Sequence, residues 1–338
     1  MKIKIAGALV ALAATTSVFA APVYPTFQDP NYGFEIYSLS SEGYVGQTFT
    51  SGGQLVRSNG GGGVYVHSLA ADTTVHGTNT IHSATFSSIS GYSGGYGLTT
   101  GMDGTIYANT GSGVQVINLA TNTATTVAIT AAHGGAYGIK TMADGRIAHS
   151  TSSQIYIYDP VLGTDTLIYN APTFIDDIAT DTLGNIFLAG LGNSTTIIIN
   201  SMGTVLNTIA SSHNNDGMAY GNGSIYKNNT DGTVTRLDFT DSTYSTLVSE
   251  VLIASGGGYG DLASVGPDGS FYVTNQNLMF ADGTYTGGYV LARISCNSGP
   301  CFAGGGIPDP TSVPEPATLL LTGVGMLGMA LSRRRRAA

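Results

Sequence analysis

The chain has 338 residues, of which 48 are glycine and only 10% are charged. This composition excludes a helix-rich fold, because glycine destabilises helices while the abundant Thr, Val, Ile and Tyr favour strands. The hydrophobic content of 42% excludes a chain too polar to fold, and the net charge of −9 argues against nucleic-acid binding.

Residues 1–20 have the pattern of a secretory signal peptide. Lys2 and Lys4 precede an apolar stretch over Ile5–Ala14, and small residues lead to a cleavage point after Ala20. A permanent transmembrane anchor would need about 20 apolar residues. We therefore expect export through the secretion machinery, with removal of residues 1–20.

A repeated hairpin pattern runs through Tyr32–Arg293. Two of its clearest copies begin Asp103-Gly104 and Asp268-Gly269, each followed by an apolar run. Such a pair between apolar runs predicts a type I′ hairpin turn, in which both central residues have positive φ. The turn glycines stand at positions 53, 104, 145, 184, 223 and 269, at spacings of 39 to 51 residues. This period predicts an all-β, six-bladed β-propeller, which we place at residues 21–303.

The first strand of the body has no partner in the first repeat. Phe34–Leu39 reads as a strand, and the last repeat lacks a fourth strand before the Gly- and Pro-rich stretch that starts at Gly304. We predict that this N-terminal strand completes the last blade and removes a free sheet edge. The alternative is a leader that packs elsewhere.

The recurring Asp-Gly-x-Ile-Tyr strand pair and its period resemble six-bladed propellers of the NHL and SMP-30-like kind. The resemblance implies an architecture and no activity. SMP-30-like lactonases hold a metal in the channel through Glu, Asn and Asp, and those positions do not match this sequence residue by residue.

Acidic residues stand at the start of several predicted innermost strands. These strands line the channel of a propeller, so several carboxylates would converge at one mouth. Such oxygens suit Ca²⁺ or another divalent cation, and a metal-dependent enzyme would need three of them within about 2.6 Å of a common point. The alternative is a solvated acidic rim or carboxylates that cap backbone amides. The candidates are Asp176, Asp177, Asp216 and Asp261.

Tyrosines cluster at the same predicted strand starts. Their amphipathic rings would stack on sugar faces or on a partner protein, although the absence of Trp weakens the sugar interpretation. The alternative is packing at strand edges. The principal candidates are Tyr96, Tyr137 and Tyr259, and Tyr92 and Tyr220 belong to the same predicted cluster.

Cys296 and Cys301 are the two cysteines, and they bracket a turn-forming Asn-Ser-Gly-Pro spacer. Export to an oxidising compartment favours a local disulfide between them. Free thiols are the alternative. A disulfide here would reinforce the seam at which the N-terminal strand completes the last blade.

The C-terminal segment, residues 313–338, has three parts and follows a linker at 304–312. Its apolar run, Ala317–Leu331, would extend roughly 22 Å as a helix, short of the approximately 30 Å hydrocarbon core. The arginines behind it would hold that end on the cytoplasmic side. The polar parts are Pro314, Glu315 and Pro316 before the run, and Arg333, Arg334, Arg335 and Arg336 after it.

This order of parts resembles the PEP-CTERM sorting signal of Gram-negative bacteria. The resemblance implies that an exosortase recognises Pro314, Glu315 and Pro316, cuts nearby and releases the protein to the cell surface or matrix. It implies a transient inner-membrane span by the apolar helix, and hosts that make exopolysaccharide. A simple membrane tail anchor is the alternative.

Together these features predict an exported surface or matrix propeller that binds exopolysaccharide or another surface protein without catalysis. The alternatives are a metal-dependent hydrolase or lactonase and a carbohydrate-binding module. No organic cofactor is expected. Loss of both terminal segments would leave six basic and 20 acidic residues, a net charge of about −14, which excludes a nucleic-acid partner.

Overall fold

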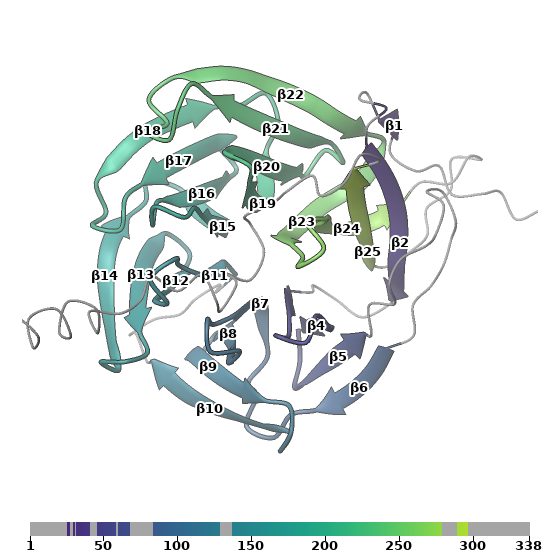
Figure 1. The fold of residues 1–338 in the computed structure, drawn as a ribbon, viewed down its shortest axis with the longest axis vertical. Coiled ribbons are helices and arrows are strands. Elements are labelled where there is room, and N and C mark those ends of the chain that lie inside the picture. Colours follow the sequence, from purple (N-terminus) through teal and green to yellow (C-terminus); the bar gives the residue numbers. More distant parts are fainter. Residues whose placement is uncertain are drawn as a thin grey trace, which may run out of the picture.

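The computed structural model describes residues 26–27, 30, 32–40, 46–58, 60–67, 84–128, 137–278 and 289–296. Their strands form six sheets around a central axis (Figure 1). Each sheet has four strands, and one carries a fifth at its outer edge. The predicted all-β, six-bladed propeller is confirmed.

Blades 1 to 3 follow one another in chain order, each running from the axis outward. Blade 1 comprises β3 (Gln47–Phe49), β4 (Leu55–Ser58), β5 (Gly63–His67) and β6 (Ala84–Ser88). Blade 2 comprises β7 (Gly95–Thr100), β8 (Ile106–Thr110), β9 (Gly113–Asn118) and β10 (Thr123–Ala128). Blade 3 comprises β11 (Ile139–Thr141), β12 (Ile147–Ser150), β13 (Gln154–Asp159) and β14 (Thr164–Asn170).

Blades 4 to 6 continue the circle. Blade 4 comprises β15 (Phe174–Thr180), β16 (Ile186–Leu191), β17 (Thr195–Ile199) and β18 (Val205–Ala210). Blade 5 comprises β19 (Asn215–Gly221), β20 (Ser224–Asn229), β21 (Val234–Phe239) and β22 (Leu247–Ser255). Blade 6 comprises β23 (Gly257–Val265), β24 (Phe271–Leu278), β25 (Tyr289–Cys296) and the N-terminal strand β2 (Tyr32–Ser40).

The middle strands are buried on both faces because each blade packs between two others. In β17 the consecutive residues Ile197, Ile198 and Ile199 are all buried, with alternate side chains in the cores on the two sides of blade 4. An unbroken apolar run of this kind is what burial on both faces of a sheet requires.

The glycine of each inner hairpin adopts positive φ, between 68° and 88° in all six blades. In five blades, however, it is the only such residue of the turn. In blade 2, for example, the Gly104 amide donates to the Gly101 carbonyl at 2.9 Å, which closes a three-residue loop. Only Asn222 and Gly223 of blade 5 both have positive φ. The predicted type I′ turn is therefore wrong for the other five blades.

The N-terminal strand closes the ring as predicted. β2 runs antiparallel to β25, from the Tyr32–Cys296 pair to the Ser40–Tyr289 pair, and the two lie side by side in Figure 1. The sequence did not indicate that the preceding strand, β1 (Thr26–Phe27), pairs with β22 of blade 5. The N-terminal segment thus fastens two blades together.

Tyr32 adds a side-chain contact to this closure. It is buried in a core shared by blades 5 and 6, and the guanidinium Nη1 of Arg236 donates to its hydroxyl at 3.0 Å. Burial of an aromatic ring and one hydrogen bond therefore support the junction in addition to the backbone pairing.

Several sequence predictions fall outside the described residues. These are the signal peptide (1–20), Cys301, the linker and the sorting segment (313–338), so the disulfide with Cys296, the last residue of β25, remains a prediction. Within the part of the chain that the structure describes, no helix is long and apolar enough to cross a membrane.

Candidate functional site

Four inner strands carry a bulge near their first residues, at the end of the channel that we call the mouth. The register of β15, for instance, shifts between Ile175 and Ile178. A bulge redirects a side chain that regular alternation would place within the sheet. The residues that the register skips, and that therefore have no partner residue on the next strand, are Tyr96 in β7, Asp176 and Asp177 in β15, Asp216 in β19, and Asp261 and Leu262 in β23.

A constant spacing shows that these residues occupy equivalent places. Tyr96, Tyr137, Asp176 and Asp261 each precede the turn glycine of their own blade by eight residues. Asp216 precedes its glycine by seven, because the blade 5 loop is shorter. This spacing, which is visible in the sequence, is a further signal that the predicted aspartates and tyrosines lie on one circle.

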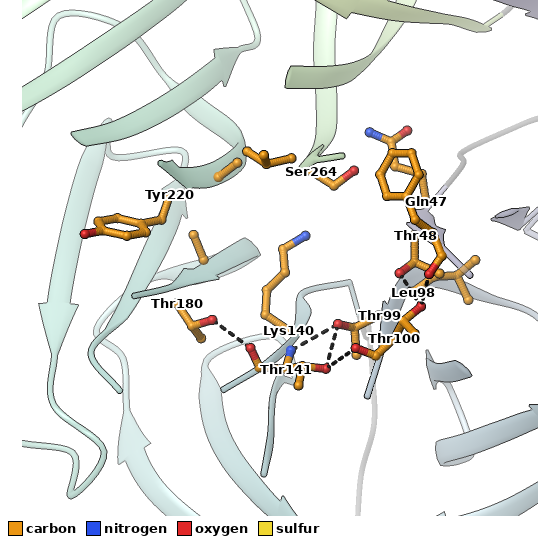
Figure 2. Close-up of a pocket in the computed structure, with 14 residues that line it drawn as sticks. Gln47, Thr48, Leu98, Thr99, Thr100, Lys140, Thr141, Thr180, Tyr220 and Ser264 are labelled. Atoms are coloured by element: carbon orange, nitrogen blue, oxygen red, sulfur yellow. Dashed lines mark hydrogen bonds between the residues drawn. The ribbon is translucent and has the colours of Figure 1, made fainter. Parts of the chain in front are cut away.

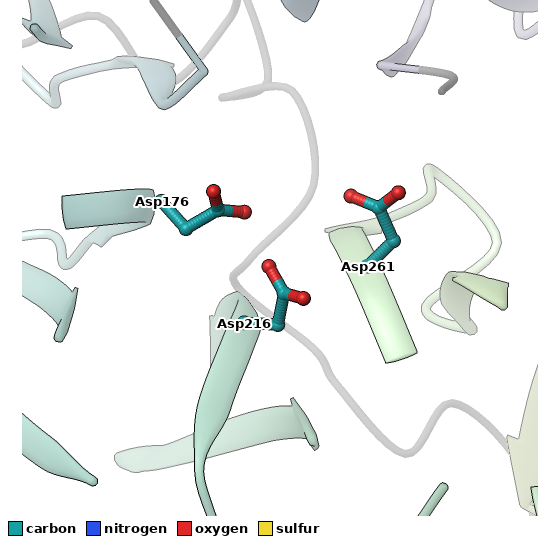
Figure 3. A group of neighbouring side chains, drawn as sticks. All are labelled: Asp176, Asp216 and Asp261. Atoms are coloured by element: carbon teal, nitrogen blue, oxygen red, sulfur yellow. The ribbon is translucent and has the colours of Figure 1, made fainter. Parts of the chain in front are cut away.

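Three of the carboxylates meet at the mouth. Asp176, Asp216 and Asp261, which we call the carboxylate trio, point toward one another from neighbouring blades (Figure 3). One oxygen of each lies within 4.8 Å of the others. The trio lines a cavity of about 200 Å³ together with Tyr137 and Tyr259.

The trio is deeply buried, with only 3–6% of each residue exposed. Oδ1 of Asp261 accepts a hydrogen bond from the Leu262 amide at 2.8 Å. Its Oδ2 has no hydrogen-bond partner among the described residues. A buried carboxylate oxygen without a donor is costly, and it indicates a ligand that the protein itself does not supply.

Burial raises the pKa of all three carboxyl groups. It raises the pKa of Asp176 to about 6 and that of Asp261 to about 7, where the charge of Asp176 adds to the effect. The pKa of Asp216 rises furthest, through burial and its contact with Asp176. At neutral pH three like charges cannot coexist here without a cation.

Asp177, the fourth predicted carboxylate, does not join the trio. It is buried, and its Oδ2 accepts hydrogen bonds from the Met218 amide at 2.9 Å and the Ala263 amide at 3.2 Å. Lys140 Nζ lies 3.8 Å from its Oδ1 and donates to the Ala263 carbonyl at 2.8 Å. Asp177 therefore joins blades 4, 5 and 6, so its role is structural.

Replacing Asp177 by Ala is expected to destabilise the fold by about 3 kcal/mol or more, since two buried amides lose their acceptor. Urea unfolding would measure this loss. Asp177→Asn retains one acceptor oxygen and should cost less. Equal losses in the two variants would contradict the assignment of Asp177 to these amides.

Aromatic side chains form the other side of the mouth. The rings of Tyr96 and Tyr137 stack with centroids 4.7 Å apart, and Phe174 meets Tyr137 edge-on at 5.7 Å. We call these three residues the aromatic wall. Tyr259 is 41% exposed beside the trio, and its hydroxyl contacts Asp216.

Two tyrosines of the predicted cluster lie elsewhere. Tyr92 is buried, with its hydroxyl bonded to Ser58 and to the Gly95 carbonyl. Tyr220 lies near the other end of β19 and stacks on Phe187. Their grouping with the mouth is wrong: Tyr92, in the loop before β7, turns its ring into a buried core, and Tyr220 lies near the far end of its strand.

A second, smaller cavity of about 80 Å³ lies farther along the channel and is lined by all six inner strands (Figure 2). Hydroxyls link adjacent blades here: Thr48 bonds to Thr100 at 2.9 Å and Thr99 to Thr141 at 3.1 Å. The Lys140 side chain points into this cavity (Figure 2). Since the threonine hydroxyls hydrogen-bond to one another and Lys140 hydrogen-bonds to the Ala263 carbonyl, the side chains in this part of the channel link the blades.

The family model of the PEP-CTERM protein-sorting motif matches residues 312–336. No curated protein matches the chain. Among solved structures, virginiamycin B lyase from Staphylococcus aureus matches with a TM-score of 0.54 and 11% identity, over 78% of this chain and 98% of the lyase. A luciferin-regenerating enzyme matches with a TM-score of 0.58 and 11% identity, over 81% of this chain and 99% of that enzyme.

Regucalcin from Agrobacterium tumefaciens, described as a calcium-binding protein, matches with a TM-score of 0.55 and 15% identity, over 80% of this chain and 98% of that one. Identities this low establish the fold and nothing finer. The protein is thus a six-bladed β-propeller with a PEP-CTERM sorting motif, which implies export and processing by an exosortase.

Proposed function

We propose that the released propeller works at the cell surface or in the extracellular matrix as a binding module that depends on a divalent cation. Asp176, Asp216 and Asp261 would hold the cation at the mouth. The observation that carries this proposal is the convergence of three buried carboxylates, one with an oxygen that lacks a partner among the described residues.

The donor set favours Ca²⁺. Carboxylate oxygens suit hard cations, and a spacing within 4.8 Å is compatible with one ion about 2.3–2.6 Å from each oxygen. Ca²⁺ accepts six to eight oxygens in flexible geometry, whereas Mg²⁺ demands a regular octahedron and retains its waters. Regucalcin, a calcium-binding protein by its description, has the same fold and supports this choice only by analogy.

The residues around the trio favour binding over hydrolysis. A metal-dependent hydrolase needs a base to take a proton from water, and all three carboxylates would be engaged as ligands. Of the described residues that line this cavity, Tyr137 and Tyr259 are the remaining ones with a titratable side chain. Burial raises the pKa of Tyr259 to about 12, so it is no base at neutral pH.

A hydrolase or lactonase is the second candidate, because the trio meets the three-oxygen requirement of such an enzyme. In that reaction a base would take a proton from water while the water oxygen adds to the lactone carbonyl carbon. The bond between that carbon and the ring oxygen would then break, and the ring oxygen would receive the proton from the base. A panel of lactones would be tested for hydrolysis in the presence of Ca²⁺, Mn²⁺ or Zn²⁺. Hydrolysis by the unsubstituted chain that is lost in Asp216→Asn would support this candidate.

Calorimetric titration of the purified chain with CaCl₂ tests the cation site. We expect one site with a Kd of about 10⁻⁴ M, as in extracellular calcium modules. Asp216→Asn should weaken binding at least tenfold, while Asp144→Asn, an exposed carboxylate paired with Arg146, should leave it unchanged. Equal affinity in all three proteins would refute the site.

The sorting segment gives an independent prediction. Substituting Ala for Pro314, Glu315 and Pro316 together should abolish release, because in this proposal they are the part of the matched motif that the exosortase recognises. Fractionation of host cells should then show the protein in the membrane, with its tail uncleaved. Unchanged release would mean that another sequence directs processing.

A further inference from the structure

We propose that the ligand of the mouth is a neutral glycan, whose adjacent hydroxyls complete the coordination of the cation while one sugar face stacks on the aromatic wall. This inference rests on the cation site proposed above. It adds the chemical class of the ligand.

The cation would present its open positions to the cavity. Three carboxylate oxygens supply only part of the six to eight that Ca²⁺ requires. The trio residues are 94–97% buried, and Oδ2 of Asp261 lacks a partner among the described residues. The cavity of about 200 Å³ is the open space next to them, so the remaining oxygens would come from a molecule in it.

That molecule must also fit apolar walls. The cavity is lined by Tyr137, Phe174 and Leu191 as well as by the trio. The Tyr96–Tyr137 stack and the edge-on Phe174 form one surface across blades 2 to 4, next to the carboxylates of blades 4 to 6. A ligand here needs a flat apolar face and vicinal oxygens on one small ring. A pyranose sugar has both.

Charge selects a neutral sugar over a uronate. Three ionised carboxylates and one divalent cation retain one negative charge. Asp177 and Lys140 lie next to the mouth and offset each other, with 3.8 Å between Lys140 Nζ and Asp177 Oδ1. With a body charge of about −14, a carboxylated sugar would be repelled from the mouth as a whole. Hydroxyl oxygens coordinate Ca²⁺ without adding charge.

The experiment titrates the full-length chain with methyl glycosides of mannose, glucose, galactose and fucose, in CaCl₂ and then in EDTA. Galacturonate is the charged comparison. We expect at least one neutral glycoside to bind in calcium, binding to disappear in EDTA, and galacturonate to bind at least tenfold more weakly. Thermal unfolding of each variant shows that the fold is intact.

Variants separate the two halves of the site. Asp216→Asn should abolish binding of calcium and sugar together. Tyr137→Ala should weaken sugar binding about tenfold with calcium affinity unchanged, while Tyr137→Phe, which keeps the ring, should bind sugar normally. Calcium binding without any neutral sugar, or with galacturonate preferred, overturns this inference and leaves the cation site standing. Absence of calcium binding overturns both.

Discussion

Removal of residues 21–40 is expected to lower the midpoint of thermal unfolding by more than about 10 °C. The deletion takes away β2, so β25 becomes an open edge, and it takes away β1, which pairs with blade 5. It also removes buried Tyr32, and loss of one such ring costs roughly 3–5 kcal/mol. Differential scanning calorimetry of the truncated and intact chains measures the shift.

A peptide of residues 26–40 provides the matched control. Added to the truncated chain, it should restore much of the lost stability, because the pairing sites on β25 and β22 are still present. A scrambled peptide should have no effect. Unchanged stability after the deletion would show that the ring closes without its N-terminal strand.

The metal-free protein is expected to lose stability as pH rises from 5 to 8. Each trio carboxyl has a folded pKa above its unfolded value of about 3.9. The folded state therefore binds more protons than the unfolded state, and its stability falls until pH passes the folded values, about 6 for Asp176 and about 7 for Asp261. Asp176 and Asp261 alone would account for a loss of roughly 4 kcal/mol, or about 8–15 °C, and Asp216 adds to it.

The groups with lowered pKa values do not obscure this window. Asp231, Asp238 and Glu250 have pKa values lowered by hydrogen bonds that outweigh burial. Their contribution to the free energy of unfolding is fully present above their unfolded pKa values, and it is lost only below about pH 4. Melting curves between pH 5 and 8 therefore report mainly on the trio and on Asp177, whose pKa burial also raises.

Calcium and one substitution should both flatten this pH dependence. At 100 times its Kd, Ca²⁺ would add about 2.7 kcal/mol at pH 8, where it replaces the proton that the metal-free trio retains on Asp216. In the metal-free protein, folding at pH 8 requires Asp216 to take up a proton that the unfolded chain does not hold. Asp216→Asn removes this cost, so it should raise the melting temperature at pH 8. Asp144→Asn should behave as the unsubstituted chain. A pH profile that calcium leaves unaltered would contradict a cation at the trio.

The blade count was predictable because each blade must turn sharply at the same point near the axis. That constraint places a glycine with positive φ in every inner hairpin, and its period is visible in the sequence. The turn type was not predictable from the Asp-Gly pair, because Asp-Gly also suits a three-residue loop that ends in glycine. Strand register decides between the two.

The site was predictable in outline only. Sequence placed acidic residues at strand starts, yet Asp176 and Asp177 are adjacent and have opposite roles. The bulge in β15 decides which side chain enters the mouth, and a bulge leaves no clear composition signal. Tyr220 was misplaced for a similar reason, since its distance from the turn glycine differs from that of Tyr96 and Tyr137.

The pairing of Tyr32 with Cys296 joins residues that are 264 positions apart in the sequence. Forming such a contact requires closure of a very long loop, which makes it a late event in folding. Until β2 pairs, β25 keeps a free edge. We therefore expect folding intermediates that precede closure of the ring to expose this edge and to associate through it.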